Sequence, residues 1–184
     1  IGEQSFKALT TGSWQTAVGS KALQDNTTGH SNTAVGVGAL KDNTTATNNT
    51  AVGTNSMTTS TTAASGVAVG AGSLAALTTG DYNVANGIRT LNRNTSGQHN
   101  IATGMNSLYY SITASNNIGM GQYTLYQNQY SERNIAIGNS ALKFMQYGTT
   151  VNTTHNLAIG NLALYSTNPT STTNGRDNIA IGDS

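Results

Sequence analysis

Residues 134–138 read Asn-Ile-Ala-Ile-Gly, and related pentapeptides return along the whole chain of 184 residues. Their final glycine recurs every 17 residues as far as Gly138 and then twice at intervals of 22 residues. A fixed period of this length is typical of proteins built from stacked repeats. The glycine row consists of Gly2, Gly19, Gly36, Gly53, Gly70, Gly87, Gly104, Gly121, Gly138, Gly160 and Gly182.

We number this glycine position 0 of each repeat. Two further positions recur with the same spacing. Position −4 is Asn in eight of ten repeats, and position +4 is apolar in all ten, with Phe6 and Met57 standing among leucines. The asparagines are Asn32, Asn49, Asn83, Asn100, Asn117, Asn134, Asn156 and Asn178. The leucines are Leu23, Leu40, Leu74, Leu91, Leu108, Leu125, Leu142 and Leu164.

Positions −3 to −1 predict a short strand in every repeat. Position −2 is Ala in nine of ten repeats, with Gly119 as the exception, and its two neighbours are mostly branched apolar residues. Side chains of a strand alternate between faces, so the branched pair shares one face and Ala takes the other. The glycine supplies a corner, by positive φ or by close approach of another backbone. The small residue at +3 and the Leu at +4 predict a second short strand, which leads into a polar turn such as 25–29.

Stacking these units predicts an all-β, parallel β-solenoid of about eleven coils, with equivalent residues about 4.8 Å apart. We expect the Asn row to form a hydrogen-bonded ladder, and the branched and Leu rows to form a thin core. No stretch keeps the three-and-four spacing of a helix. Alternation leaves two arrangements of the strand open. Either the Ala row is where neighbouring chains meet, or Ala fills a narrow interior and the branched residues face partner chains.

The repeats at 32–40 (Asn-Thr-Ala-Val-Gly-Val-Gly-Ala-Leu) and 134–142 (Asn-Ile-Ala-Ile-Gly-Asn-Ser-Ala-Leu) resemble two kinds of fibrous protein. They are similar to the Asn-Thr-Ala-Ile-Gly repeats of bacteriophage and algal-virus tail or surface fibres, and to the heads of trimeric autotransporter adhesins. The resemblance covers the whole chain and implies a left-handed β-roll with three chains around one axis. Adhesin head repeats are usually shorter than 17 residues, and no neck or coiled-coil stalk appears within these 184 residues.

The repeats predict a single domain over residues 1–184. Because the chain begins and ends within a repeat, we expect it to be a segment of a longer fibre. Two enlarged repeats at 139–178 carry loop insertions near 147–152 and 168–173, and the only proline, Pro169, falls in the second. Such insertions should stack on one side of the rod.

The composition excludes several kinds of partner. Only 8% of residues are charged, against about a quarter in ordinary domains, and the net charge is +1. This balance gives no electrostatic case for nucleic acid or an anionic membrane, and no run approaches the length of a membrane span. The chain has no cysteine, so it has no disulfide framework. We expect no cofactor and no metal site.

Few residues offer catalytic chemistry. His30, His99 and His155 do not fall at one spacing after their glycines, which predicts no shared site. Asp25 and Asp42 share a repeat position, as the carboxylates of a depolymerase could, but Asp-Asn-Thr-Thr is a turn sequence in which Asp bonds the backbone. Gly-x-Gly pairs without a following helix predict no dinucleotide site. We therefore expect no catalytic residue.

Seven of the eight tyrosines lie between 109 and 165. Exposed tyrosines among Asn and Gln suit stacking on sugars, and the alternative is that the rings pack along the rod or between chains. The candidate receptor contacts are Tyr126, Tyr130, Tyr147 and Tyr165.

The sequence thus favours a stiff spacer in a homotrimeric viral tail or surface fibre, joined to other fibre or virion proteins. It would position, or contribute to, binding of a cell-surface glycan or protein receptor. The alternative is a bacterial adhesin head that binds host matrix or glycans. Both place the chain outside the cell, on a virion or on the bacterial outer surface.

Overall fold

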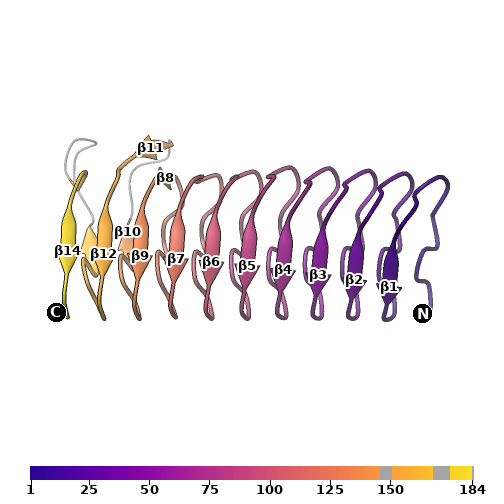
Figure 1. Ribbon diagram of the computed structural model, residues 1–184, viewed down its shortest axis with the longest axis horizontal. Helices are drawn as coiled ribbons and strands as arrows, with labels where there is room; N and C mark the ends of the chain where they lie inside the picture. The colour runs from indigo at the N-terminus through magenta and orange to yellow at the C-terminus, as the bar shows by residue number, and fades with distance from the viewer. Residues whose placement is uncertain (146–150, 168–174, 184) are drawn as a thin grey trace.

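The computed structural model describes residues 1–145, 151–167 and 175–183. In this part of the chain the protein is all-β, and its backbone winds into a parallel β-solenoid. The coils lie side by side along one long axis, with the two termini at opposite ends (Figure 1). The predicted fold class is therefore confirmed.

One wall of the solenoid is a ten-stranded parallel sheet in the order β1-β2-β3-β4-β5-β6-β7-β9-β12-β14. Each of its strands occupies positions −3 to −1 of a repeat. They are β1 (Thr16–Val18), β2 (Thr33–Val35), β3 (Thr50–Val52), β4 (Val67–Val69), β5 (Val84–Asn86), β6 (Ile101–Thr103), β7 (Ile118–Met120), β9 (Ile135–Ile137), β12 (Leu157–Ile159) and β14 (Ile179–Ile181).

Equivalent residues pair directly across every step of the sheet. Ala17 pairs with Ala34, for example, and the same register continues after the repeats lengthen, where Ala136 pairs with Ala158. The extra residues of the long repeats therefore loop out without disturbing the sheet. The sheet has ten strands rather than the expected eleven, although the carbonyl of Ile1 accepts a hydrogen bond from the Gly19 amide (2.8 Å) and extends the ladder by part of a rung.

The row glycine turns the corner after each strand for both of the expected reasons. Gly53 has a φ of +133°, and a Cβ placed on it would lie 2.6 Å from the carbonyl carbon of Gly70 in the next rung. A side chain at this position would combine backbone strain with a clash against backbone atoms. The glycine is therefore required by the stacking itself.

The predicted second strand at +3 and +4 is wrong for most repeats. Leu40 at +4 has a φ of +49°, in the left-handed region, and the same holds for the other described leucines of the row. This segment is a chain of turns that still bonds from coil to coil, as when the Leu40 amide donates to the Ser56 carbonyl at 3.0 Å. Parallel pairing on this side occurs only between β10 (Phe144–Met145) and β13 (Ser166–Thr167) in the described residues.

The branched residues of the strands do not form the core, contrary to one of our expectations. The Ala row points into the coil, where Ala102 is 0% exposed, and it packs with the Leu row in one continuous core. The branched rows, expected to join that core, lie outside it, and Ile101 is 43% exposed. The interior is too narrow for branched side chains opposite a full row of leucines, so only Ala fits there. Of the two arrangements left open, the structure has Ala inside the coil and the branched residues on its outer face.

The predicted Asn ladder at position −4 is confirmed. The backbone amide of Asn117 donates to the side-chain Oδ1 of Asn100 (3.0 Å), and the backbone amide of Asn134 donates in turn to Asn117 Oδ1 (3.0 Å). The side-chain Nδ2 of Asn117 also donates to the Ser131 carbonyl (3.0 Å). The buried side-chain amide of Asn117 thus satisfies two backbone groups at the corner of the next rung.

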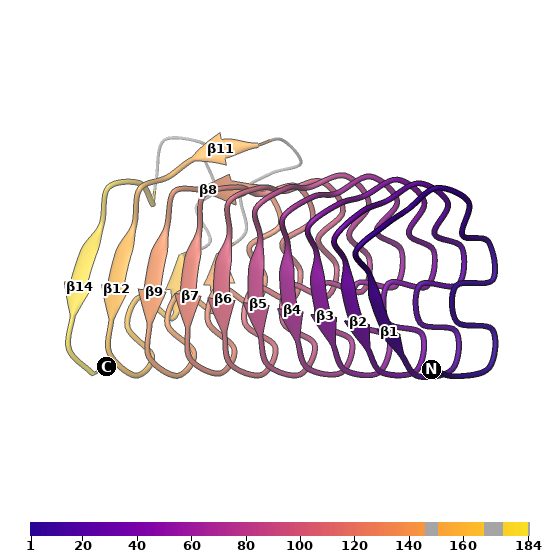
Figure 2. The ribbon, with the colours of Figure 1, turned by 45° about the vertical axis from the view of Figure 1, so that its right-hand side comes forward.

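The enlarged repeats rejoin the regular path after their insertions. β11 (Asn152–Thr153) pairs with β8 (Ser131–Glu132) at one edge of the solenoid, away from the main sheet (Figure 2). After the second insertion, Asn156 Nδ2 donates to the Gly175 carbonyl at 2.8 Å. The insertion residues 146–150 and 168–174, which include Tyr147 and Pro169, lie outside the described residues.

Candidate functional site

The outer face of the ten-stranded sheet carries the most extended apolar surface of the described residues. We call positions −3 and −1 of its strands the sheet face. Branched apolar residues such as Val69, Val84 and Ile135 are each 37–39% exposed there, and none of the ten strands has a charged residue on this face. With nine steps of about 4.8 Å, the sheet face is about 43 Å long.

The two rows of the sheet face are interrupted in different places. The −3 row begins with three threonines, Thr16, Thr33 and Thr50, and is apolar from Val67 onward. The −1 row is apolar except at β5 and β6, where it has a polar residue on each of two adjacent rungs. Every strand thus presents at least one apolar side chain outward.

A second surface lies on the opposite wall, at positions +2, +5 and +6, which point away from the buried leucines. Tyr109, Tyr110, Tyr123 and Tyr126 form one cluster there, which we call the tyrosine patch. The rings of Tyr109 and Tyr126 stack at 5.5 Å, and Tyr110 meets Tyr126 edge-on at 5.2 Å. All four residues are half-buried. Packing between rings on successive rungs stabilises the patch.

Two cations border the tyrosine patch. Arg93 lies over the Tyr110 ring at 5.0 Å, and Lys143 lies over Tyr123 at 4.8 Å. Neither cation has a carboxylate partner among the described residues. Burial, followed by the neighbouring Tyr110, raises the pKa of Tyr126 above its ordinary value. The patch is therefore a polarised aromatic surface with positive charge at both ends.

The three predicted receptor contacts among the described residues, Tyr126, Tyr130 and Tyr165, do not form one cluster. Tyr126 belongs to the tyrosine patch, whereas Tyr165 packs edge-on against Phe144 at 5.1 Å beyond Lys143. Tyr130 is half-buried, and its carbonyl accepts from the Asn152 amide (3.1 Å). Tyr147 lies outside the described residues.

Sequence reasoning did not single out Tyr109, Tyr110, Arg93 and Lys143 for this surface. Tyr109 and Tyr126 are 17 residues apart and hold the same repeat position. Aligning positions +5 and +6 of every repeat would therefore have placed them side by side.

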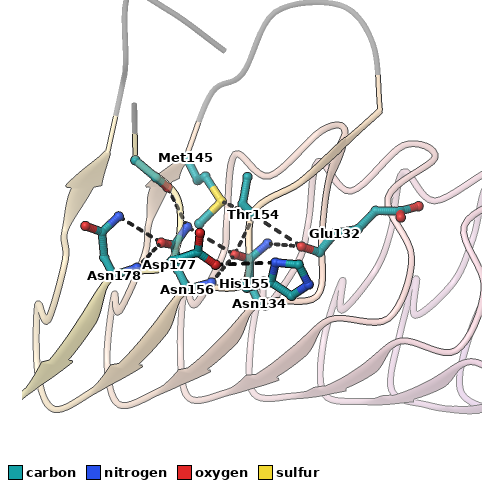
Figure 3. Close-up of polar contacts among 9 residues, drawn as sticks. Glu132, Asn134, Met145, Thr154, His155, Asn156, Asp177 and Asn178 are labelled. Carbon is teal, nitrogen blue, oxygen red and sulfur yellow. Dashed lines mark hydrogen bonds and ion pairs between the residues drawn. The ribbon is translucent and has the colours of Figure 1, made fainter. Parts of the chain in front are cut away.

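The histidines contradict one expectation. His99 and His155 both occupy position −5, a corner with left-handed backbone (φ 57° and 52°). Counting from the preceding glycine missed this shared position, because the insertion lies between Gly138 and His155. They are still three rungs apart and have separate partners. His99 stacks on Tyr82 at 5.1 Å, and His155 Nδ1 lies 3.5 Å from Asp177 Oδ1 on the next rung (Figure 3). Both members of that ion pair are exposed, which makes it weak.

The acids have partners of a structural kind. Asp42 forms an ion pair with Lys41 (2.8 Å), and Asp25 accepts a hydrogen bond from Gln24 Nε2 (3.3 Å). The hydrogen bond to Asp42 raises the pKa of Lys41. The expected bond from Asp to the turn backbone is made instead by the next residue, since Asn26 Nδ2 donates to the Gly29 carbonyl (3.3 Å). These carboxylates therefore do not cap the turn.

The described residues contain no group of three or more His, Cys, Asp or Glu side chains that could hold a metal ion. They also contain no helix long and apolar enough to cross a membrane. Comparison of the chain with protein-family models, with curated proteins and with solved structures gives no match.

Proposed function

We propose that the chain is a non-catalytic rod segment of a homotrimeric viral tail or surface fibre, located outside the cell. The observation that carries the proposal is the uncharged apolar sheet face along the outside of the coil. A strip about 43 Å long and roughly 12 Å wide has an area on the order of 500 Å². An exposed patch of this size is at the upper end for monomers and typically marks an interaction surface.

The periodicity of the sheet face favours further copies of the same chain as its partners. Only a surface with the same rise of about 4.8 Å per rung meets every side chain of the strip in the same way. A parallel copy has that rise by construction. In a parallel trimer the −1 rows of the three chains can meet around the common axis, so that equivalent residues face one another, while each −3 row packs against one neighbour.

The interior supports a mechanical role. The Asn ladder, the Leu row and the backbone bonds between coils all run along the axis, so each rung is held by the next. Such a rod can separate a virion from the point of attachment while keeping its shape. Low charge and a surface of Asn, Thr and Ser suit exposure outside a cell.

The tyrosine patch is the surface that we assign to receptor contact. It lies on the wall opposite the sheet face, so three chains packed through their sheets would leave it accessible. Aromatic rings bordered by the free cations Arg93 and Lys143 suit a sugar ring or a carboxylated glycan. This observation favours the second candidate function, a bacterial adhesin head that itself binds glycans. In the intact protein, a neighbouring virion-attachment domain would favour the fibre, and a stalk with a membrane-anchor barrel would favour the adhesin.

Light scattering on the purified chain tests the proposal. We expect a mass three times the chain mass of 18.9 kDa. The substitution Ile118→Lys places a charge on the sheet face without entering the coil, and it should reduce the mass to that of one chain. The matched control, Ala76→Lys, adds the same charge on the opposite wall and should leave the mass unchanged.

Circular dichroism should show the same β content for both variants, because residue 118 points out of the coil. A wild-type protein that stays monomeric at high concentration would overturn the assembly. A stable dimer would keep the sheet face as an interface and overturn the three-chain arrangement.

A further inference from the structure

A sheet face that repeats every rung can dock a second copy in many alignments. Sliding one chain along another by one rung, about 4.8 Å, brings nearly identical side chains together again and loses contact only at the ends. A fibre segment assembled through this face, as proposed above, therefore needs a feature that breaks the repeat. The inference below rests on that proposed assembly.

The −1 row contains such a feature at its middle. Asn86 in β5 and Thr103 in β6 pair with each other across the sheet, and they interrupt an apolar row that has Val69 on one side and Met120 on the other. The side chain at position −3 of both strands remains apolar. Asn86 is exposed and Thr103 is half-exposed, so both point out of the coil into the proposed interface.

Neither polar side chain has a partner of its own. Within the described residues, the amide of Asn86 and the hydroxyl of Thr103 make no hydrogen bond, and only their backbone atoms are used in the ladder. By contrast, Asn83 in the preceding corner donates to the carbonyls of Gly80 and Gly97 at 3.2 and 2.7 Å. An amide carries both donors and acceptors, so it can pair with an identical amide from another chain.

We propose that Asn86 and Thr103 form a polar layer that fixes the axial register of the assembled chains. In the correct register Asn86 faces Asn86, Thr103 faces Thr103, and every apolar side chain faces another. A slip of one rung places Asn86 against Val69 at one contact and Thr103 against Met120 at the other. A buried polar group left without a partner is disfavoured, so the aligned register is selected.

Disulfide trapping tests the register, because the chain has no cysteine of its own. A disulfide between two chains that both carry Val69→Cys shows the aligned register. Val69→Cys mixed with Val52→Cys, on chains with tags of different length, reports a slip of one rung. A disulfide needs Cα atoms within about 7 Å, which separates the two cases. Val69→Cys mixed with Met120→Cys reports an antiparallel pair, in which β4 faces β7.

In the otherwise wild-type chain we expect aligned cross-links to exceed slipped ones by at least about tenfold. In the Asn86→Val/Thr103→Val background the two should approach equal yield, while light scattering still gives the associated mass. The control Thr28→Val/Thr45→Val also replaces two polar side chains by valine, in exposed loops, and should keep the aligned excess.

The outcomes separate this inference from the proposed assembly. A monomeric wild-type chain, or cross-links of the antiparallel pair, would contradict the proposed parallel trimer. An associated wild-type chain with no aligned cross-link at Val69, or with an aligned excess that survives in Asn86→Val/Thr103→Val, would overturn the polar layer alone.

Discussion

Two polar rows run through the interior of the coil, and they differ in how well they are hydrogen-bonded. In the −4 row, Asn100, Asn117, Asn134 and Asn156 stand on consecutive rungs, and each Oδ1 accepts from the next rung. The +7 row mixes residue types along the chain: Asn26, Asn43, Ser60, Leu77, Asn94, Ser111, Asn128 and Met145. Four of its buried polar atoms have no protein partner: Asn43 Oδ1, Ser60 Oγ, Asn94 Nδ2 and Ser111 Oγ.

The difference lies in what each row bonds to. In the +7 row an Asn reaches the next rung only where that rung presents a matching amide, as Asn43 does to Asn26, whereas in the −4 row the side chain bonds to the backbone, as when Asn49 Oδ1 accepts from the Gly66 amide at 2.8 Å. Where Ser or Leu intervenes, the bond is lost although the position stays buried. The −4 row should therefore contribute more to stability than the +7 row, and the predictions below test this in order of expected effect.

The largest effect is expected for Asn117→Ala in the −4 row. The change leaves the buried Asn134 backbone amide without its acceptor, and it removes one of the two donors to the Ser131 carbonyl, which keeps its bond from Asn128 Nδ2 (2.9 Å). We expect the free energy of unfolding to fall by about 3 kcal/mol. Denaturant unfolding at a fixed protein concentration measures it, and a loss below about 1 kcal/mol would contradict the importance of the ladder.

Repairing the break in the −4 row should have the opposite sign. Gly66 interrupts the row, and a Cβ there would meet the Met57 Cε at 2.9 Å, which is the end of a flexible side chain. The double variant Gly66→Asn/Met57→Leu restores the Asn and Leu combination of other repeats. We expect a gain of about 1–2 kcal/mol. Gly66→Asn alone serves as the comparison, and no gain in the double variant would mean that the ladder tolerates gaps.

A smaller effect is expected in the +7 row for Ser111→Ala. The Ser111 Oγ is buried without a protein partner, so removing it should leave stability unchanged or raise it by up to about 1 kcal/mol. The same denaturant experiment measures it. A loss as large as that of Asn117→Ala would erase the distinction between the two rows.

The smallest effect concerns pH and the tyrosine patch. Because the pKa of Tyr126 is raised in the folded state, its contribution is present below the ordinary tyrosine pKa and is lost as pH rises through the folded value. As the pH rises from about 9 to about 11, a range centred on the ordinary tyrosine pKa, the Tyr126→Phe variant should therefore lose less stability than the wild-type protein. Equal pH dependence of melting temperature in the two proteins would contradict the shift.

The sequence predicted the features that depend on the repeat period, and it left open those that depend on the direction in which a side chain points. Spacing alone located the corner glycines, the Leu core and the Asn ladder, since residues 17 apart must stack once the chain winds. It did not decide whether Ala102 or Ile101 points inward, because alternation assigns two faces without saying which is inside. It also predicted a strand at Leu40, whose left-handed backbone leaves no trace in residue type.

The candidate surfaces were less accessible to sequence reasoning for a related reason. The sheet face is the side of each strand opposite the Ala row, so it could not be located before the Ala side chains were known to point into the coil. The tyrosine patch depends on rows +5 and +6, which vary in composition and attract no attention as repeats. The polar residues Asn86 and Thr103 were visible as breaks in a row, and their meaning came from finding that row on the outside.

In the proposed assembly, Ala faces into the coil and the branched residues are covered by other chains. Labelling rates of single cysteines test it directly. Ala136→Cys should resist labelling at every protein concentration, and Ile135→Cys should resist it only where the chain is associated, with Ser96→Cys in an exposed loop as the reference. Labelling of Ile135→Cys as fast as the reference at high concentration, or rapid labelling of Ala136→Cys, would contradict the account.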